Sequence, residues 1–290
     1  MGEGDLYECK KWICMSLVPA AVIGLLAGCG NTAGGGASSE GTKTVKVGTL
    51  SGPHSEVLEE VKKAAASKGL NVEIVEFNDY VQPNETLNNG EIDANMYQHL
   101  PFLQNHIKDR GYKLSSMGTT ILFPMGVYST KIKSVDEIRD HMTVAIPNDP
   151  SNGARGLELL NKAGVIKLNK EKNGKASVTD IVENPHQLVF KEVDAAMIPR
   201  MLPDLDFAAI NNSYAAKSGL VPTRDAFILE GADSPYANIL AVRTADLDRP
   251  ELKLLMECFR SPDVKQFIQD HFKGSRCCGL VRGPIYESRP

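Results

Sequence analysis

Arg155 stands in the first turn of a predicted helix, directly after the loop PNDPSN at residues 147–152. The start of a helix leaves backbone N–H groups without partners and carries partial positive charge, so a cation there is unfavourable by a few tenths of a kcal/mol. Two explanations are open. Asp149 forms a salt bridge with the arginine, or the guanidinium and the loop N–H groups converge on a bound carboxylate or phosphate, which suits the bidentate geometry of arginine.

Sequence motifs for catalysis are absent from the chain. It contains no GxSxG, HExxH, P-loop or GxGxxG motif and no cluster typical of a catalytic triad. Carboxylate pairs such as Glu59 and Glu60 fall on the solvated face of a predicted helix. We therefore expect a protein that is not an enzyme, with no catalytic residue and no cofactor.

Charge and cysteine content argue against two further classes. The formal net charge is -4 and the two signs are mixed along the chain without a basic stripe, so no nucleic-acid partner is expected. The six cysteines include no CxxC pair and no Cys/His spacing that would hold zinc. The sequence predicts neither a metal site nor a disulfide framework.

The N-terminal segment has the pattern of an export signal. Residues 10–29, KKWICMSLVPAAVIGLLAGC, place two lysines before a short apolar run and then small residues, and the run is too short for a membrane span of about 20 residues. The ending LAGC matches the lipobox of bacterial lipoproteins, which predicts a signal peptide over 1–28 and lipidation of Cys29. A Gly/Ser tether is expected over 29–43. The protein is then lipid-anchored at the extracytoplasmic face of the cell membrane.

The body alternates short β-rich runs with helical ones, which favours βαβ units and a mainly parallel sheet. Its length suits two lobes better than one core, and ligands of such sheets bind beyond the carboxyl ends of the strands. The loops 50–54 and 148–155 are therefore ligand candidates. Predicted strands are 44–50, 71–77, 119–129, 143–148, 188–193, 207–212, 227–231 and 237–243. Predicted helices are 53–68, 98–110, 134–140, 151–164, 178–184, 250–258 and 261–271.

Several long motifs resemble, in order and spacing, the bacterial methionine-binding lipoproteins, also called the NLPA lipoprotein family. They are VGTLSGPHSEVLE, FNDYVQPNETLNNGEIDANMYQHLPFL, VAIPNDPSNGARGLELLNKAGVIKL, DIVENP, AINNSYAAKSGL and DSPYANILAVR, and the likeness covers about residues 45–273. The resemblance implies an α/β type-II periplasmic-binding-protein fold, with two lobes, a two-stranded hinge and a ligand cleft between the lobes. Lobe 1 would hold 45–128 plus 233–275, and lobe 2 would hold 129–232.

The same resemblance implies how an amino acid would be held. Arg155 would bind the α-carboxylate, with Asn152 and nearby N–H groups completing the anion site, so that the ligand supplies the missing counter-charge. Asn211 and Asn238 would bind the amino and carboxyl groups, since an amide both donates and accepts. Each asparagine could instead satisfy its own loop backbone. The partner of the ligand ammonium is left open.

An aromatic wall for the thioether is implied at Tyr80, Tyr97 and His99, because sulfur beside a ring contributes about 0.3 to 1.5 kcal/mol per contact. The alternative is that Tyr97 and Phe102 belong to the core and that His99 is a structural histidine. His54, which follows Pro53 at a helix start, is interpreted mainly as a capping residue beside the cleft.

The resemblance implies delivery of L-methionine, with D-methionine as a further candidate ligand, to the permease and ATPase subunits of an ABC importer. A methionine-containing dipeptide or a related amino acid is an alternative ligand. A surface lipoprotein with an adhesion or assembly role is an alternative function. The segment 276–290 departs from the family pattern and is expected to be an atypical tail, produced by a frameshift or by divergence.

Overall fold

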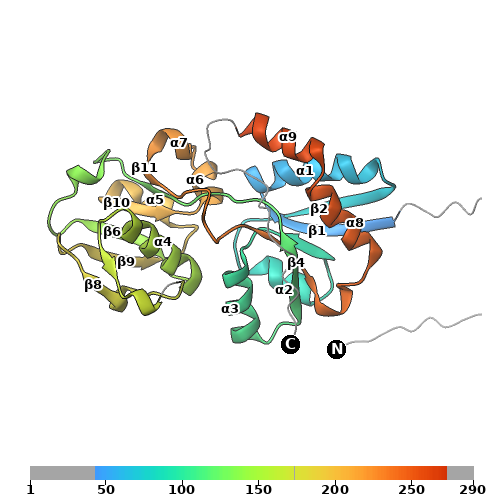
Figure 1. Ribbon diagram of the computed structural model, residues 1–290, viewed down its shortest axis with the longest axis horizontal. Helices are drawn as coiled ribbons and strands as arrows, with labels where there is room; N and C mark the ends of the chain where they lie inside the picture. The colour runs from blue at the N-terminus through green and yellow to red at the C-terminus, as the bar shows by residue number, and fades with distance from the viewer. Residues whose placement is uncertain (1–42, 173, 273–290) are drawn as a thin grey trace, which may run out of the picture. The chain divides into compact units, whose positions relative to one another are not determined.

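The computed structural model describes residues 43–172 and 174–272 (Figure 1). The first of its two five-stranded sheets has the strand order β2-β1-β3-β12-β4. Within it, β1 is parallel to β2 and β3, and β12 is antiparallel to β3 and β4. The strands are β1 (Lys43–Leu50), β2 (Leu70–Phe77), β3 (Ala94–Met96), β4 (Leu114–Thr119) and β12 (Ile239–Arg243).

Helices cover both faces of this first sheet. Alternating side chains of β12 serve the two faces, as the strand period of two requires. Leu240 and Val242 pack into the core with α1, α8 and α9, whereas Ile239 and Ala241 pack with α2 and α3. This sheet and its helices form the first lobe. The helices are α1 (Pro53–Ala66), α2 (Gln82–Asn88), α3 (Leu100–Arg110), α8 (Pro250–Phe259) and α9 (Pro262–His271).

The second sheet has the order β11-β5-β10-β6-β9, with β6 parallel to β9 and β10 and with β5 antiparallel to β10 and β11. Val144 and Ile146 pack with α4 on one face, and Ala145 packs with α5 and α6 on the other. This sheet and its helices form the second lobe. Its strands are β5 (Gly126–Tyr128), β6 (Thr143–Pro147), β9 (Val189–Val193), β10 (Phe207–Ile210) and β11 (Ala226–Leu229). Its helices are α4 (Pro150–Lys162), α5 (Ile198–Met201), α6 (Asn212–Lys217) and α7 (Pro222–Asp225).

Two neighbouring segments, 120–125 and 230–238, connect the sheets. The Thr120 N–H donates to the Asn238 carbonyl at 2.7 Å and the Asn238 N–H donates to the Ile121 carbonyl at 2.8 Å. At the other end the Glu230 N–H donates to the Met125 carbonyl at 3.0 Å. The two crossing segments are therefore hydrogen-bonded to each other, as a two-stranded connection between lobes requires.

The predicted end of the first part of lobe 1, residue 128, is wrong. β5 pairs with β10 and β11, so Gly126–Tyr128 belongs to the second lobe. The predicted strand 119–129 is also wrong over most of its length, because β4 ends at its first residue, Thr119, and β5 begins only at Gly126. Pro124 lies between them and lacks the backbone N–H that a sheet ladder needs.

Two predicted helices are shorter or different. The segment 178–184 forms a 3-10 turn, Val178–Asp180, and then β8 (Ile181–Glu183), which pairs with β7 (Lys167–Leu168). The backbone N–H and hydroxyl of Ser177 both donate to the Asp180 carboxylate, at 2.9 and 2.8 Å, which closes this single turn. The segment 134–140 likewise contains one 3-10 turn, Val135–Glu137, in place of a longer helix.

Several predictions lie outside the described residues. They are the signal peptide over 1–28, lipidation of Cys29, most of the 29–43 tether and the 276–290 tail. Lys43, the last tether residue, instead begins β1. Among the described residues no helix combines the length and apolar character needed to cross a membrane.

Candidate ligand-binding site

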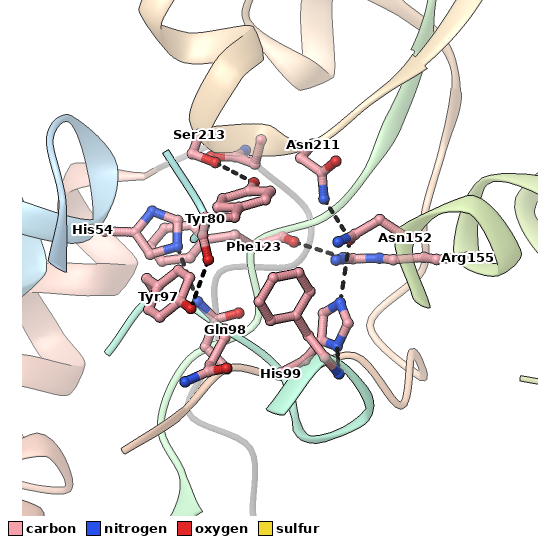
Figure 2. Close-up of a pocket in the computed structure, with 13 residues that line it drawn as sticks. His54, Tyr80, Tyr97, Gln98, His99, Phe123, Asn152, Arg155, Asn211 and Ser213 are labelled. Carbon is pink, nitrogen blue, oxygen red and sulfur yellow. Dashed lines mark hydrogen bonds between the residues drawn. The ribbon is translucent and has the colours of Figure 1, made fainter. Parts of the chain in front are cut away.

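A pocket lies where the two lobes and the crossing segments meet (Figure 2). Most lining residues follow the carboxyl ends of parallel strands, namely β1, β2 and β3 in the first lobe and β6 and β10 in the second. This is the edge at which α/β sheets bind ligands. The lining residues are His54, Tyr80, Tyr97, Gln98, His99, Phe102, Phe123, Asn152, Arg155, Asn211, Asn212, Ser213 and Asn238.

All seven predicted ligand-binding residues are in this lining: Tyr80, Tyr97, His99, Asn152, Arg155, Asn211 and Asn238. The lining also contains residues that the sequence did not assign to a ligand: His54, Gln98, Phe102, Phe123, Asn212 and Ser213. Phe123 and Asn238 lie on the crossing segments, so both lobes and both connections contribute to one pocket.

The start of α4 is capped by Asp149. Its carboxylate accepts hydrogen bonds from the Asn152 backbone N–H at 2.9 Å and from the Ser151 hydroxyl at 2.8 Å. Pro150 occupies the first helical turn, where a missing N–H has no cost. Asp149 is thus the N-cap of the helix, and the predicted alternative of a salt bridge to Arg155 is wrong.

Arg155 is buried, with 4% of its surface exposed, and its charge is already balanced within the protein. Its Nε donates to Glu230 Oε1 at 2.9 Å and its Nη2 donates to Glu230 Oε2 at 2.5 Å. Nη2 also donates to the Phe123 carbonyl at 2.9 Å. Burial opposes the charged form, but the Glu230 carboxylate outweighs burial and raises the pKa of the guanidinium above its ordinary value.

The expectation that the ligand supplies the missing counter-charge is therefore wrong, because Glu230 supplies it. Glu230 follows β11 and is 75 residues from Arg155 in the sequence. Its one local signal is an acidic residue directly after the apolar run FIL. Among the described residues no hydrogen bond uses the third guanidinium nitrogen, Nη1. Arg155 thus keeps one donor nitrogen for a ligand.

Asn152 determines the orientation of its neighbours in the pocket. Its Nδ2 donates to both Asp149 carboxylate oxygens, at 3.1 and 3.0 Å, so its Oδ1 is the acceptor on the other side. This Oδ1 accepts from Asn211 Nδ2 at 2.7 Å and from His99 Nε2 at 3.2 Å. His99 Nε2 therefore carries the ring proton, and His99 Nδ1 accepts from the Phe102 N–H at 3.3 Å. Within the described part of the chain, the Asn211 Oδ1 has no hydrogen-bond partner.

Three buried polar atoms of the lining have no hydrogen-bond partner among the described residues: His54 Nδ1, Asn211 Oδ1 and Asn212 Oδ1. Buried polar atoms are nearly always paired in folded proteins. Their gathering in one pocket indicates that a polar ligand completes them.

The interpretation of His54 as a capping residue is wrong. The N-cap of α1 is Gly52, without a side-chain hydrogen bond, and Pro53 starts the helix. The His54 ring lies 4.2 Å from the Phe123 ring, and its Nε2 lies 2.9 Å from Asn238 Nδ2, 184 residues away. With Asn238 as the donor, His54 Nδ1 carries the ring proton and is a neutral donor.

An aromatic wall forms another part of the lining (Figure 2). Tyr80 lies 6.0 Å from Tyr97 and 5.8 Å from Phe102, measured between ring centroids. The Tyr97 hydroxyl donates to the Tyr80 carbonyl at 3.0 Å, and the hydroxyls of Tyr80 and Ser213 are 2.8 Å apart. Tyr97 and Phe102 also pack in a small buried cluster with Leu50, so they have both the core position and the pocket position that the sequence left as alternatives.

A network of buried side-chain amides holds the backbone next to the aromatic wall. Gln98 Nε2 donates to Asn84 Oδ1 at 2.6 Å and to Asn95 Oδ1 at 2.9 Å. Asn84 Nδ2 donates back to Gln98 Oε1 at 2.8 Å. Because Gln98 lies between Tyr97 and His99, this network fixes the backbone that carries both rings. Its bonds join Asn84 of α2 to Asn95 and Gln98, which are 11 and 14 residues away, so no short-range pattern indicates it.

The two pocket histidines predict a pH dependence of stability. Burial, aided by Lys217 for His54 and by Arg155 for His99, lowers the pKa of each ring to about 3. The unfolded chain, with histidine pKa values near 6.5, binds more protons than the folded chain below that pH. Stability is therefore fully present above about pH 6.5 and falls towards pH 3, by up to about 1.4 kcal/mol per pH unit for each histidine.

Urea unfolding between pH 7.5 and 5 measures this dependence. In a His54→Gln variant, the slope of the free energy of unfolding against pH is expected to be smaller by the contribution of one histidine. An equal slope in the variant and the unaltered protein would contradict the assignment of a neutral, buried His54.

The chain is similar to a known protein family and to solved structures. Residues 45–278 match the family model described as NlpA lipoprotein. The D-methionine-binding lipoprotein MetQ of Salmonella typhi is 43% identical over 266 residues, which cover 91% of this chain and 97% of the relative. Outer membrane lipoprotein 2 of Mannheimia haemolytica is 42% identical over 248 residues, covering 85% and 88%. A solved structure of a nutrient binding protein from Burkholderia cenocepacia bound to methionine is 50% identical, with a TM-score of 0.77, covering 81% of this chain and 99% of that one.

Proposed function

The chain belongs to the NlpA lipoprotein family, and from that premise we propose that it captures methionine for an ABC importer. The observation that carries the proposal is the pocket, in which a buried guanidinium, unpartnered amide oxygens and an aromatic wall surround one small space. The relatives support the ligand. The Salmonella typhi protein is named for binding D-methionine, and the Burkholderia cenocepacia structure is described as bound to methionine.

The carboxylate of the amino acid binds at Arg155. Its Nη1 remains as a donor after the bonds to Glu230 and Phe123 are counted among the described residues. His54 Nδ1 supplies a second, neutral donor in the same pocket. A charge-assisted hydrogen bond of this kind is about twice as strong as a neutral one, so Arg155 dominates recognition of the acid group.

The ammonium group binds at amide oxygens. Asn211 Oδ1 and Asn212 Oδ1 are buried in the lining and have no partner in the part of the chain that the structure describes. An amide oxygen accepts hydrogen bonds from an ammonium donor. None of the described residues that line the pocket carries a carboxylate. This assigns the partner that the sequence left open, and it adds Asn212 to the predicted Asn211.

The thioether side chain packs against Tyr80, Tyr97 and Phe102. These rings leave an apolar slot beside the polar end of the pocket, and sulfur at a ring edge adds about 0.3 to 1.5 kcal/mol per contact. Because the carboxylate and ammonium contacts are shared by all amino acids, this slot decides between methionine and other side chains.

Isothermal titration calorimetry of the purified chain with L-methionine tests the proposal. Ligands of this size reach about -9 kcal/mol, so submicromolar binding is expected. D-methionine and a methionine-containing dipeptide are the comparison ligands, and they rank the alternatives that share the carboxylate contact. If no amino acid or short peptide produces heat or raises the melting temperature, the proposal fails and an adhesion or assembly role is favoured.

We also propose how the protein is anchored and which proteins receive its ligand. Cys29 carries the lipid that anchors the chain at the extracytoplasmic face of the cell membrane, and the permease and ATPase subunits of the importer receive the ligand. The chain acts by binding and not by catalysis. Methionine recovered unchanged after prolonged incubation with the protein supports this, whereas turnover would contradict it.

A further inference from the structure

We infer that Glu230 makes the pocket selective for ligands of zero net charge, by balancing the charge of Arg155 from outside the pocket lining. This inference rests on the proposed function, because it concerns how the same pocket distinguishes an amino acid from ligands that lack one of its charged groups.

Among the described residues, the Glu230 carboxylate accepts hydrogen bonds from at least four donors. Oε1 accepts from Arg155 Nε at 2.9 Å and from the Ser234 hydroxyl at 2.8 Å. Oε2 accepts from Arg155 Nη2 at 2.5 Å and from the Met125 N–H at 2.9 Å. An ionised carboxylate accepts hydrogen bonds only, so this set of donors fits the charged form. Glu230 is therefore a fixed negative charge in direct contact with the arginine.

Few ionised side chains line the pocket. Among the lining residues, Arg155 is the one side chain that is ionised at neutral pH, because burial keeps His54 and His99 neutral. The pair of Arg155 and Glu230 has zero net charge. Neither Asp149 nor Lys217 belongs to the lining. Asp149 accepts from the Asn152 amide and caps α4, and Lys217 donates to Asn78 at 3.0 Å.

An amino acid suits a pocket of zero net charge because its own charges also sum to zero. Its carboxylate lies beside Arg155, and neutral amide oxygens hold its ammonium. A ligand without the ammonium brings one uncompensated negative charge into a buried, neutral site, and burying an unpaired charge is costly. A ligand without the carboxylate brings a positive charge next to Arg155. The pocket therefore disfavours both kinds of ligand: the anion because Glu230 cancels the charge of Arg155, and the cation because it lies beside the guanidinium without a carboxylate to pair with it.

The Glu230→Gln variant tests the inference with three ligands: L-methionine, the anion 4-(methylthio)butanoate and the cation 3-(methylthio)propylamine. Removing the negative charge leaves the pocket positive. The ratio of the anion's Kd to that of L-methionine is expected to fall by about tenfold or more. Binding of the cation is expected to weaken further. Calorimetry at one ionic strength measures all three affinities.

Asp233→Asn is the matched control. Asp233 lies on the same crossing segment and loses the same charge, but its ion pair with Lys162 is exposed and it does not line the pocket. All three affinities are expected to remain unchanged in this variant. If Glu230→Gln weakens every ligand by one common factor, Glu230 has a structural role only and the inference is overturned.

The unaltered protein gives a second measurement that does not depend on folding of the variant. It is expected to bind L-methionine at least about a hundredfold more tightly than either singly charged ligand. An anion that binds within tenfold of L-methionine would overturn the inference while leaving the proposed function intact. Failure of L-methionine itself to bind would overturn the proposed function.

Discussion

The Arg155→Ala variant is expected to bind L-methionine at least about thirtyfold more weakly than the unaltered protein, a loss of about 2 kcal/mol. The ligand carboxylate is then buried without its charged donor. The same change leaves Glu230 without the cation that donates two hydrogen bonds to it. Breaking a buried ion pair by removing one partner costs about 3 to 5 kcal/mol of stability. Calorimetry measures the affinity and urea unfolding measures the stability.

A double variant separates these two effects. Arg155→Ala combined with Glu230→Ala removes both charges, so much of the lost stability is expected to return while the affinity stays low. Unchanged affinity in the single variant would contradict the assignment of the carboxylate to Arg155. Recovery of affinity in the double variant would contradict it as well.

Asn152→Ala has the next largest expected effect. Asn152 Oδ1 is the acceptor for both His99 and Asn211, so its removal leaves two donors of the pocket without their partner. Each unsatisfied buried donor costs about 1 to 3 kcal/mol. We expect L-methionine affinity to fall by about tenfold to a hundredfold, because the Asn211 amide then loses the orientation that directs its oxygen to the ligand.

Ser151→Ala is the control for this variant. Ser151 is also buried and also donates to Asp149, at 2.8 Å, but it does not line the pocket. It is expected to reduce stability slightly and to leave affinity unchanged. Equal affinity losses in the two variants would show that the start of α4 matters as a whole, and the specific role of Asn152 would be wrong.

Local patterns predict much of the fold. The α/β class with two lobes, which the alternation of strands and helices and the length predict, is confirmed by the two covered sheets. The type-II periplasmic-binding-protein fold, which the family resemblance implies, is confirmed by the likeness to solved relatives. The segment 151–164 is predicted as a helix and α4 spans Pro150–Lys162, because an acidic cap and a proline mark its start. The short strand Ala94–Met96 is missed, since three buried residues have no periodicity to detect.

Seven of the pocket residues were predicted because they match a family pattern, but the other lining residues and the hydrogen-bond partners were not. Glu230 is 75 residues from Arg155, and His54 is 184 residues from Asn238. Such contacts arise only when the crossing segments bring the lobes together, and no window of sequence contains both members. The sequence therefore indicates which side chains gather at the site, whereas the structure shows which charges and hydrogen bonds are already satisfied there.

A crystal structure of the protein grown with L-methionine tests the central claim most directly. The account predicts the ligand carboxylate within hydrogen-bond distance of Arg155 Nη1, with the Arg155–Glu230 pair intact. It predicts the ammonium at Asn211 Oδ1 and Asn212 Oδ1. An empty pocket, or a ligand whose acid group lies away from Arg155, would contradict it.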